Sequence, residues 1–277
     1  MNNDISSVLG DWEYAPGELR VRKVEGRDGR AKIQVRMDLG VMQLEWDGRP
    51  DGVRPKECAS LLDYYLDKLA RSQEQDGVDS FSLSRDDCWD LAQEAMKFYW
   101  RRISFFELKE YALAEQDARH NLSILDLCYQ YAEAEEDRQM AEQHTPFVTA
   151  HRIQARVLSH LDGEEHKKAL GVIRGGIVEI EDYLRRTGRF DQLEECPELH
   201  FLREWETEVE SARPMSKLEQ LREELAVGRV RGGALAEEEA PGSKDAMCGP
   251  RCPGARRGGR GGRGARASPP PRGPCLC

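Results

Sequence analysis

Two stretches of the chain, EYALAEQDARHNL at residues 110–122 and EHKKALGVIRGGI at residues 165–177, decide the predicted fold. Laid over each other, they place Ala114 on Ala169, and in both the apolar residues recur every three or four positions. That spacing puts the apolar side chains on one face of an α-helix. Because the small residues let a neighbouring helix approach closely, each stretch is expected to form half of a helical hairpin.

The first predicted hairpin begins at Ser84, which is expected to cap its first helix. Trp89, Trp100 and Phe106 in this helix are interpreted as core residues rather than a ligand cage. The connection between the two helices is short, so they are expected to lie antiparallel. The apolar stripes are Trp89, Ala92, Met96, Tyr99, Ile103 and Phe106 in the first helix, and Tyr111, Ala114, Ala118, Leu122, Leu125 and Tyr129 in the second.

The second predicted hairpin begins at Thr145 and Pro146, which suit the N-cap and first positions of a helix. Its second helix is expected to stop near Gly188. Further helices are predicted at residues 57–73, and from Pro197 until Pro214 interrupts the pattern. The stripes of the second hairpin are Ala150, Ile153, Val157 and Leu161, then Ala169, Ile173, Ile177, Ile180 and Leu184.

These two hairpins resemble a pair of degenerate tetratricopeptide-type repeats over residues 84–187, although their offset is longer than the 34-residue period of that family. The resemblance implies a rigid helical surface that binds other proteins. Two ordinary amphipathic hairpins in a helical bundle would give the same pattern. In either case the fold class is mainly α, and the helical domain is assigned to residues 56–212.

Residues 1–55 are predicted to form a small antiparallel β-meander. LRVRKV, AKIQVRM and VMQLEW, within residues 19–46, alternate apolar and polar residues as half-buried strands do. GRDG at residues 26–29 supplies an Asp-Gly hairpin signal between the first two strands. Three strands are marginal alone, so one face of the sheet is expected to pack against helices.

The charge of the chain is uneven. The formal net charge is −10, but residues from Gly228 onward contain ten Lys and Arg against four Asp and Glu, which leaves −16 on residues 1–227. An acidic body disfavours a broad nucleic-acid-binding surface, because phosphate attraction needs clustered Lys and Arg. No apolar run approaches the roughly 18 residues that span a membrane. The first residues include neither a basic leader nor an apolar run typical of a signal peptide, so export is not expected.

No motif for catalysis, cofactor or metal binding is found. The six histidines are scattered without an HExxH pattern, and there is no P-loop or GxSxG elbow. Cys58, Cys88, Cys128 and Cys196 are widely spaced, which is typical of reduced thiols in a cytoplasm. The sequence therefore predicts a cytoplasmic protein that is not an enzyme and uses no cofactor.

The segment at residues 214–227 contains the candidate partner-binding residues. Ser216 and Glu219 form a capping box at a predicted helix start. KLEQLREELAV then resembles the first helix of the UVR motif found in UvrB and UvrC, and the layout of the chain resembles bacterial proteins that contain this motif. In that family the hairpin pairs with another helical hairpin, which here implies a binding seam made of Met215, Leu218, Leu221 and Leu225.

No second UVR helix is found in the sequence after residue 227. Residues 228–277 contain no Phe, Tyr, Trp or Ile but hold 12 of the 25 Gly and 7 of the 13 Pro. This tail is predicted to be disordered. One interpretation is a natural Arg/Gly/Pro-rich tail, and the other is translation out of frame. Shifted forward by one base, codons for Gly228–Ala234 permit the acidic corner around one aromatic residue that a UVR turn requires.

The predicted function is that of a non-enzymatic adaptor, which binds a protein partner through helical hairpins and the UVR-type helix. Self-association is one form that such pairing could take. The alternative is a DNA-repair accessory factor that contacts UvrB/UvrC-like partners or nucleic acid. An enzyme with dispersed carboxylates is a third class, and no motif supports it.

Overall fold

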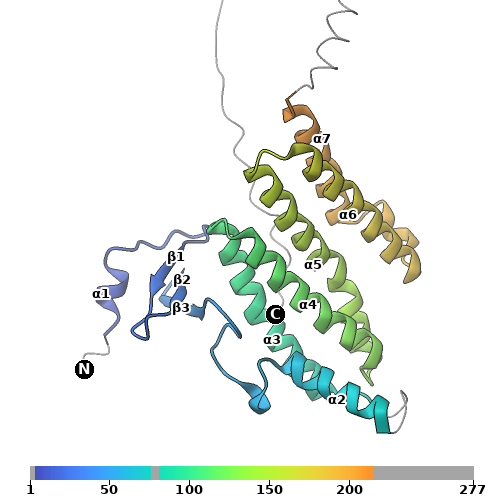
Figure 1. Cartoon of the computed structure of the whole chain (residues 1–277), viewed down its shortest axis with the longest axis horizontal. Coiled ribbons are helices and arrows are strands. Elements are labelled where there is room, and N and C mark those ends of the chain that lie inside the picture. The colour runs from blue at the N-terminus through green and yellow to red at the C-terminus, as the bar shows by residue number, and fades with distance from the viewer. Residues whose placement is uncertain (1–3, 76–80, 215–277) are drawn as a thin grey trace, which may run out of the picture. The chain divides into compact units, whose positions relative to one another are not determined.

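A computed structural model of the chain describes residues 4–75 and 81–214. The described part is mainly helical and carries a small antiparallel sheet near its N-terminus, as the sequence predicted (Figure 1). The helices are α1 Ser6–Leu9, α2 Leu61–Gln75, α3 Arg85–Glu107, α4 Tyr111–Tyr131, α5 Glu135–Asp162, α6 His166–Arg186 and α7 Pro197–Ala212, and the strands are β1 Val21–Glu25, β2 Ala31–Met37 and β3 Gly40–Glu45.

The three strands form the predicted meander in the order β1-β2-β3. At the GRDG turn, the Gly26 amide donates to the Arg30 carbonyl at 2.7 Å, and Gly29 takes a positive φ of 73° that suits glycine. Ile33, Val35 and Leu44 point to one face and are buried against Phe105 of α3, Ala114 of α4 and Ala155 of α5. The helices thus cover the apolar face of the sheet.

Helices α3 to α7 pack one against the next in chain order. The connections at residues 108–110, 132–134 and 163–165 are three residues each, so neighbouring helices run antiparallel (Figure 1). The predicted stripes of the second hairpin are confirmed: Ile153, Val157, Ile173 and Ile180 are buried together, and α7 adds Leu199 and Leu202 to this core. Pro197 begins α7, as predicted.

The start of α3 follows the sequence prediction, but its buried face does not. Ser84 caps the helix in a capping box with Asp87. Trp89 was predicted to be core and is 65% exposed instead. The buried positions include Cys88, Leu91, Phe98 and Phe105, and each of them precedes a residue of the predicted stripe by one position. The stripe was misplaced because apolar residues surround much of this helix, and its neighbours α2, α4 and the sheet decide which face is enclosed.

The end of α4 also departs from the predicted stripe. Tyr129 is 40% exposed, whereas Asp117 and Asn121 are buried in the face toward α3. Both polar side chains have partners there: Asp117 accepts from Arg101, and Asn121 donates to the Ala95 carbonyl at 2.9 Å. Buried polar groups of this kind interrupt an apolar pattern, so spacing alone did not reveal that face.

The prediction that a helix begins at Thr145 and Pro146 was wrong. Pro146 lies inside α5, which begins eleven residues earlier at Glu135. A proline has no N–H for the carbonyl four residues before it, here that of Glu142. That carbonyl accepts instead from the Tyr183 hydroxyl at 3.2 Å and from Arg189 Nη1 at 3.3 Å. Partners more than forty residues away therefore make the proline tolerable within the helix.

Buried charges join the first helices to the sheet. Glu94 of α3 accepts from Arg49 Nε and from the Leu61 amide, each at 2.8 Å, and from the Leu62 amide at 3.1 Å, so it caps α2 from another helix. Arg101 of α3 binds Asp117 and also donates to the Gly48 carbonyl at 2.7 Å. These bonds fix the segment after β3 against α3 and α4.

Candidate functional site

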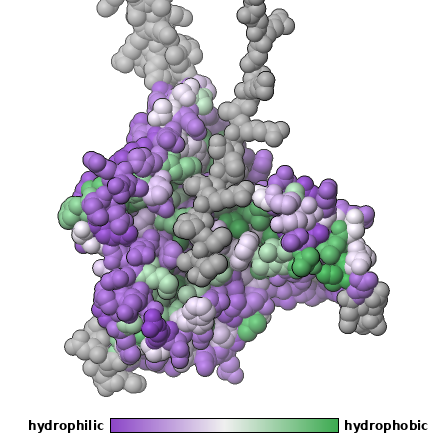
Figure 2. Space-filling view, turned by 180° about the vertical axis from the view of Figure 1, so that it is seen from behind, coloured by the Kyte–Doolittle hydropathy of each residue, from purple (hydrophilic) through white to green (hydrophobic). Residues whose placement is uncertain are grey.

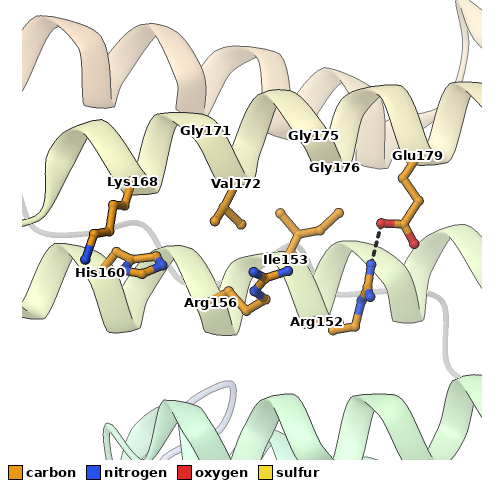
Figure 3. Close-up of a pocket in the computed structure, with 10 residues that line it drawn as sticks. All are labelled: Arg152, Ile153, Arg156, His160, Lys168, Gly171, Val172, Gly175, Gly176 and Glu179. Atoms are coloured by element: carbon orange, nitrogen blue, oxygen red, sulfur yellow. Dashed lines mark hydrogen bonds and ion pairs between the residues drawn. The ribbon is translucent and has the colours of Figure 1, made fainter.

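A groove of about 450 Å³ runs between α5 and α6 and is open to solvent. Its volume lies in the range of about 300–1,000 Å³ found for ligand sites. Figure 3 shows the two helices side by side, with charged side chains between them. The lining residues are Arg152, Ile153, Arg156 and His160 from α5, and Lys168, Gly171, Val172, Gly175, Gly176 and Glu179 from α6.

The α5 wall of the groove is a row of basic side chains. Arg152, Arg156 and His160 are four residues apart, which places them along one face of the helix about 6 Å from one another. Lys168 lies across the groove from His160, and Glu179 lies across from Arg152 (Figure 3). The groove therefore combines cationic side chains with carboxylates that pair with them, namely Glu179 in the lining and Glu115 and Glu165 beside it.

Only some of the N–H donors of Arg152 have hydrogen-bond partners. One of its terminal nitrogens, Nη2, pairs with Glu179 across the groove. Its Nε is buried and has no hydrogen-bond partner in the described part of the chain. A buried donor without an acceptor costs about 1–3 kcal/mol. Because Arg152 Nε has no accessible surface, a molecule in the groove does not contact it in this arrangement.

Arg156 lies in the middle of the row, and its side chain is more exposed to solvent than that of Arg152. Its side chain is 44% exposed, and its Nε lies 3.7 Å from Glu115 Oε1 of α4, a long contact. In Figure 3 it lies between the two helices. A guanidinium carries five N–H donors in a planar fork, so Arg156 has donors to offer to a planar anion such as a carboxylate.

Glu165 lies beside His160 and Lys168, at the end of the groove opposite Arg152 and Glu179. It accepts from Lys168 Nζ at 2.5 Å and contacts His160 Nδ1 at 2.8 Å. The hydrogen bond from Lys168, followed by that from His160, lowers the pKa of Glu165 below its ordinary value. This carboxylate therefore stays ionised at neutral pH beside the two basic groups.

Glycines form much of the α6 wall, and they are of two kinds. A Cβ added to Gly176 would lie 2.4 Å from Ile153 Cδ1, so this glycine is needed for close packing of α5 on α6. A Cβ at Gly171 or at Gly175 would meet nothing within 4 Å. Glycine inside a helix costs about 0.8–1 kcal/mol relative to alanine. Contacts within the described residues give no reason for this cost at Gly171 and Gly175.

This groove was not predicted from the sequence. The signals were present: Arg152, Arg156 and His160 at four-residue spacing, and three glycines within six residues of a predicted helix. Neither signal indicates a site until α5 and α6 are placed side by side. The residues predicted to bind a partner, Met215, Leu218, Leu221 and Leu225, lie outside the described residues, as does the tail at 228–277.

Other chemically notable side chains are buried in the core, except for Cys58, which is half-buried. Cys58, Cys88, Cys128 and Cys196 are free thiols, and Cys88 and Cys128 hydrogen-bond to each other between α3 and α4. His151 is buried among aromatic rings, and neither of its ring nitrogens has a hydrogen-bond partner in the described ranges. No group of three or more His, Cys, Asp or Glu side chains within residues 4–75 and 81–214 could hold a metal ion.

Exposed apolar side chains occur on the surface of the N-terminal part and also on the helices, for example Trp89 and Val178. Figure 2 shows a face that is mainly hydrophilic over the helices, with apolar residues gathered on the right of this view over the N-terminal part. Exposed apolar side chains in that part are Ile5, Met37 and Leu39. Among the described helices, none is long and apolar enough to cross a membrane.

Comparison of the chain with protein-family models, with curated proteins and with solved structures found no match.

Proposed function

We propose that this protein is a non-enzymatic adaptor and that it receives a segment of a partner protein in the groove between α5 and α6. The observation that carries the proposal is the open α6 wall. Gly171 and Gly175 cost helix stability, and an added Cβ there would meet open space. Such positions let another backbone approach the helix closely.

The charged side chains support a polar, recognition-type contact. Arg156 on α5 is 44% exposed and Lys168 on α6 is 64% exposed, so both walls of the groove have donors open to solvent. A protein partner is favoured over nucleic acid because residues 1–227 carry a net charge of −16, which repels a phosphate backbone outside the groove. The UVR-type helix at 214–227 stays a prediction from the sequence, as a second partner-binding element.

Filling the groove tests this proposal. Gly175→Leu places a large side chain in the open wall and also raises helix propensity, so we expect the full chain to remain folded. Val178→Leu is the matched control, because Val178 is 55% exposed on α6 and does not line the groove. Quantitative affinity capture from the native host should recover a protein with the unmodified chain and the Val178→Leu variant, but at least tenfold less of it with Gly175→Leu. Equal recovery by all three would overturn the proposal.

A further inference from the structure

Two cysteines face each other between the start of α3 and the end of α4. Cys88 ends the first turn of α3, where its amide donates to the Ser84 carbonyl at 3.0 Å. Cys128 lies in the last turn of α4, where its carbonyl accepts from the Ala132 amide at 3.0 Å. The two thiols hydrogen-bond to each other. Cysteines whose side chains point apart cannot be joined without moving the backbone, so this pair has the orientation that a disulfide requires.

The backbone holds these two helix ends together. The Leu83 amide donates to the Tyr131 carbonyl at 2.8 Å, and the Glu133 amide donates to the Leu83 carbonyl at 2.9 Å. These bonds join the residue before the α3 cap to the last residue of α4 and to the segment after it. Cys88 and Cys128 also belong to one apolar core, shared by α2, α3 and α4. The two sulfurs are therefore kept side by side by bonds that do not involve them.

The two thiols differ in acidity. The hydrogen bond from Cys128 lowers the pKa of Cys88 below its ordinary value, although burial and the charges of Asp137 and Asp87 act against it. The same hydrogen bond, and then burial, raises the pKa of Cys128. Because the thiolate is the form of cysteine that attacks, Cys88 is the first nucleophile of the pair. Cys128 is then the second thiol, which acts once Cys88 has been oxidised.

Going beyond the proposed function, and independently of the groove, we infer that Cys88 and Cys128 form a redox-sensitive site that hydrogen peroxide converts into a disulfide. The Cys88 thiolate attacks one peroxide oxygen, and the O–O bond breaks to leave Cys88–S–OH and hydroxide. The hydroxide takes up the proton that Cys88 released and becomes water. The Cys128 sulfur then attacks the Cys88 sulfur, and the hydroxyl group leaves with the Cys128 proton as a second water. Two thiols are thus oxidised, and one peroxide is reduced to two waters.

The position of the pair at two helix ends gives the oxidant a route. Cys88 is 2% exposed and Cys128 is 6% exposed, whereas the residues that follow them, Trp89 and Tyr129, are 65% and 40% exposed. Helix ends open locally at a lower free-energy cost than the centre of a core. Hydrogen peroxide is small and uncharged, so it reaches the thiols during such openings. The disulfide then locks the start of α3 to the end of α4, and reduction releases them.

Disulfide mapping of the full chain tests this inference. The reduced chain is treated with hydrogen peroxide, the remaining thiols are blocked with N-ethylmaleimide in denaturant, and the digest is analysed by mass spectrometry. Cys196 is the internal control, because it is 6% exposed like Cys128 but its sulfur donates to Glu198 Oε2 at 3.2 Å rather than to a thiol. The Cys88–Cys128 disulfide should be at least tenfold more abundant than any disulfide of Cys58 or Cys196.

Two alanine variants test the order of attack. In Cys128→Ala the sulfenic acid of Cys88 has no neighbouring thiol to resolve it, so dimedone should label Cys88 after peroxide treatment. In Cys88→Ala the label on Cys128 should be at least tenfold weaker. The disulfide itself should raise the melting temperature of the unmodified chain by about 5 °C or more, because it restricts the unfolded state. Dithiothreitol should reverse this rise, and Cys128→Ala should not show it.

Each other result overturns a defined part of the inference. If no Cys88–Cys128 disulfide forms, or if Cys196 is oxidised equally, the redox site is wrong. Stronger labelling of Cys128 than of Cys88 would overturn the order of attack while leaving the site. A lower melting temperature in the disulfide form would show that the fold does not place the two sulfurs for this bond. None of these results bears on the proposed function, which is tested separately by the Gly175→Leu capture experiment.

Discussion

The α3–α4 and α5–α6 interfaces are both antiparallel helical hairpins that contain Arg–carboxylate pairs, but they place these pairs in opposite surroundings. Between α3 and α4, the side chains of Arg101 and Asp117 are 6% and 3% exposed. Between α5 and α6, those of Arg152 and Glu179 are 18% and 49% exposed. Buried pairs are costly to break, whereas exposed pairs contribute little and exchange partners readily. One interface is therefore suited to holding the fold, and the other to binding.

The electrostatics of the buried carboxylates fit this contrast. Burial alone would raise the pKa of Glu94, but hydrogen bonds from His120 and from the Leu61 and Leu62 amides hold it below its ordinary value. Burial raises the pKa of Asp117, and the pairing with Arg101 opposes that rise only in part. Replacing either carboxylate would therefore leave its hydrogen-bond donors buried and without an acceptor.

The largest expected effect comes from the buried network. Glu94→Ala removes the shared acceptor of Arg49, Leu61 and Leu62, and should lower the free energy of unfolding by about 3–5 kcal/mol. The comparison variant Glu179→Ala, in the exposed pair, should cost no more than about 1 kcal/mol. Urea denaturation of the full chain measures both. Equal losses would show that the buried network around Glu94 holds the fold no more strongly than the exposed pair does.

The next largest effect on stability is expected from alanine substitutions at two adjacent glycines, and the two effects have opposite signs. Gly176→Ala forces a methyl group against Ile153 and should destabilise the chain by about 1–3 kcal/mol. Gly175→Ala meets open space and should stabilise it by about 0.5–1 kcal/mol. Thermal denaturation of the two variants and the unmodified chain measures the difference. A loss of stability in Gly175→Ala would mean that this wall is not free.

The last effect depends on pH and concerns His151, the neighbour of Arg152 in α5. Burial, and then the nearby charge of Arg102, lower the pKa of His151 well below 6.5. In the unfolded chain its pKa returns to about 6.5, so below that pH the unfolded state binds an additional proton. The contribution of His151 to stability is therefore present above about pH 6.5 and is lost as the pH falls toward the folded-state pKa.

The loss approaches about 1.4 kcal/mol per pH unit below about pH 6. His151→Gln removes the titrating group, so its stability should fall less steeply with acid than that of the unmodified chain. Urea midpoints at pH 7, 6 and 5 measure the two slopes. Parallel slopes would contradict the buried, neutral state of His151.

Local signals predicted most of the fold. The GRDG turn, the Ser84 cap, Pro197 and the apolar stripes of α5 and α6 act within one or two turns of the chain, and each is confirmed. The errors arose where distant partners decide. Trp89 is exposed because the neighbours of α3 enclose another face, and α5 continues through Pro146 because α6 and the segment after it supply hydrogen-bond donors.

The groove was beyond sequence reasoning for the same reason. Gly175 and Gly176 are adjacent residues of the same type, yet a Cβ added at Gly175 would face open space and one added at Gly176 would meet Ile153. Arg156 and Arg203 are equally ordinary surface arginines until α6 is placed against α5. The candidate site is a property of two helices together, and the periodicity of either helix alone does not contain it.

The proline within α5 ties the folding of that helix to the order in which the chain is made. The Glu142 carbonyl receives its donors from residues up to 47 positions later in the chain. As the polypeptide leaves the ribosome, the Glu142 carbonyl lacks these two donors until residues 183 and 189 have emerged. In the finished protein, these two hydrogen bonds join the first half of α5 to the end of α6 and to the segment after it.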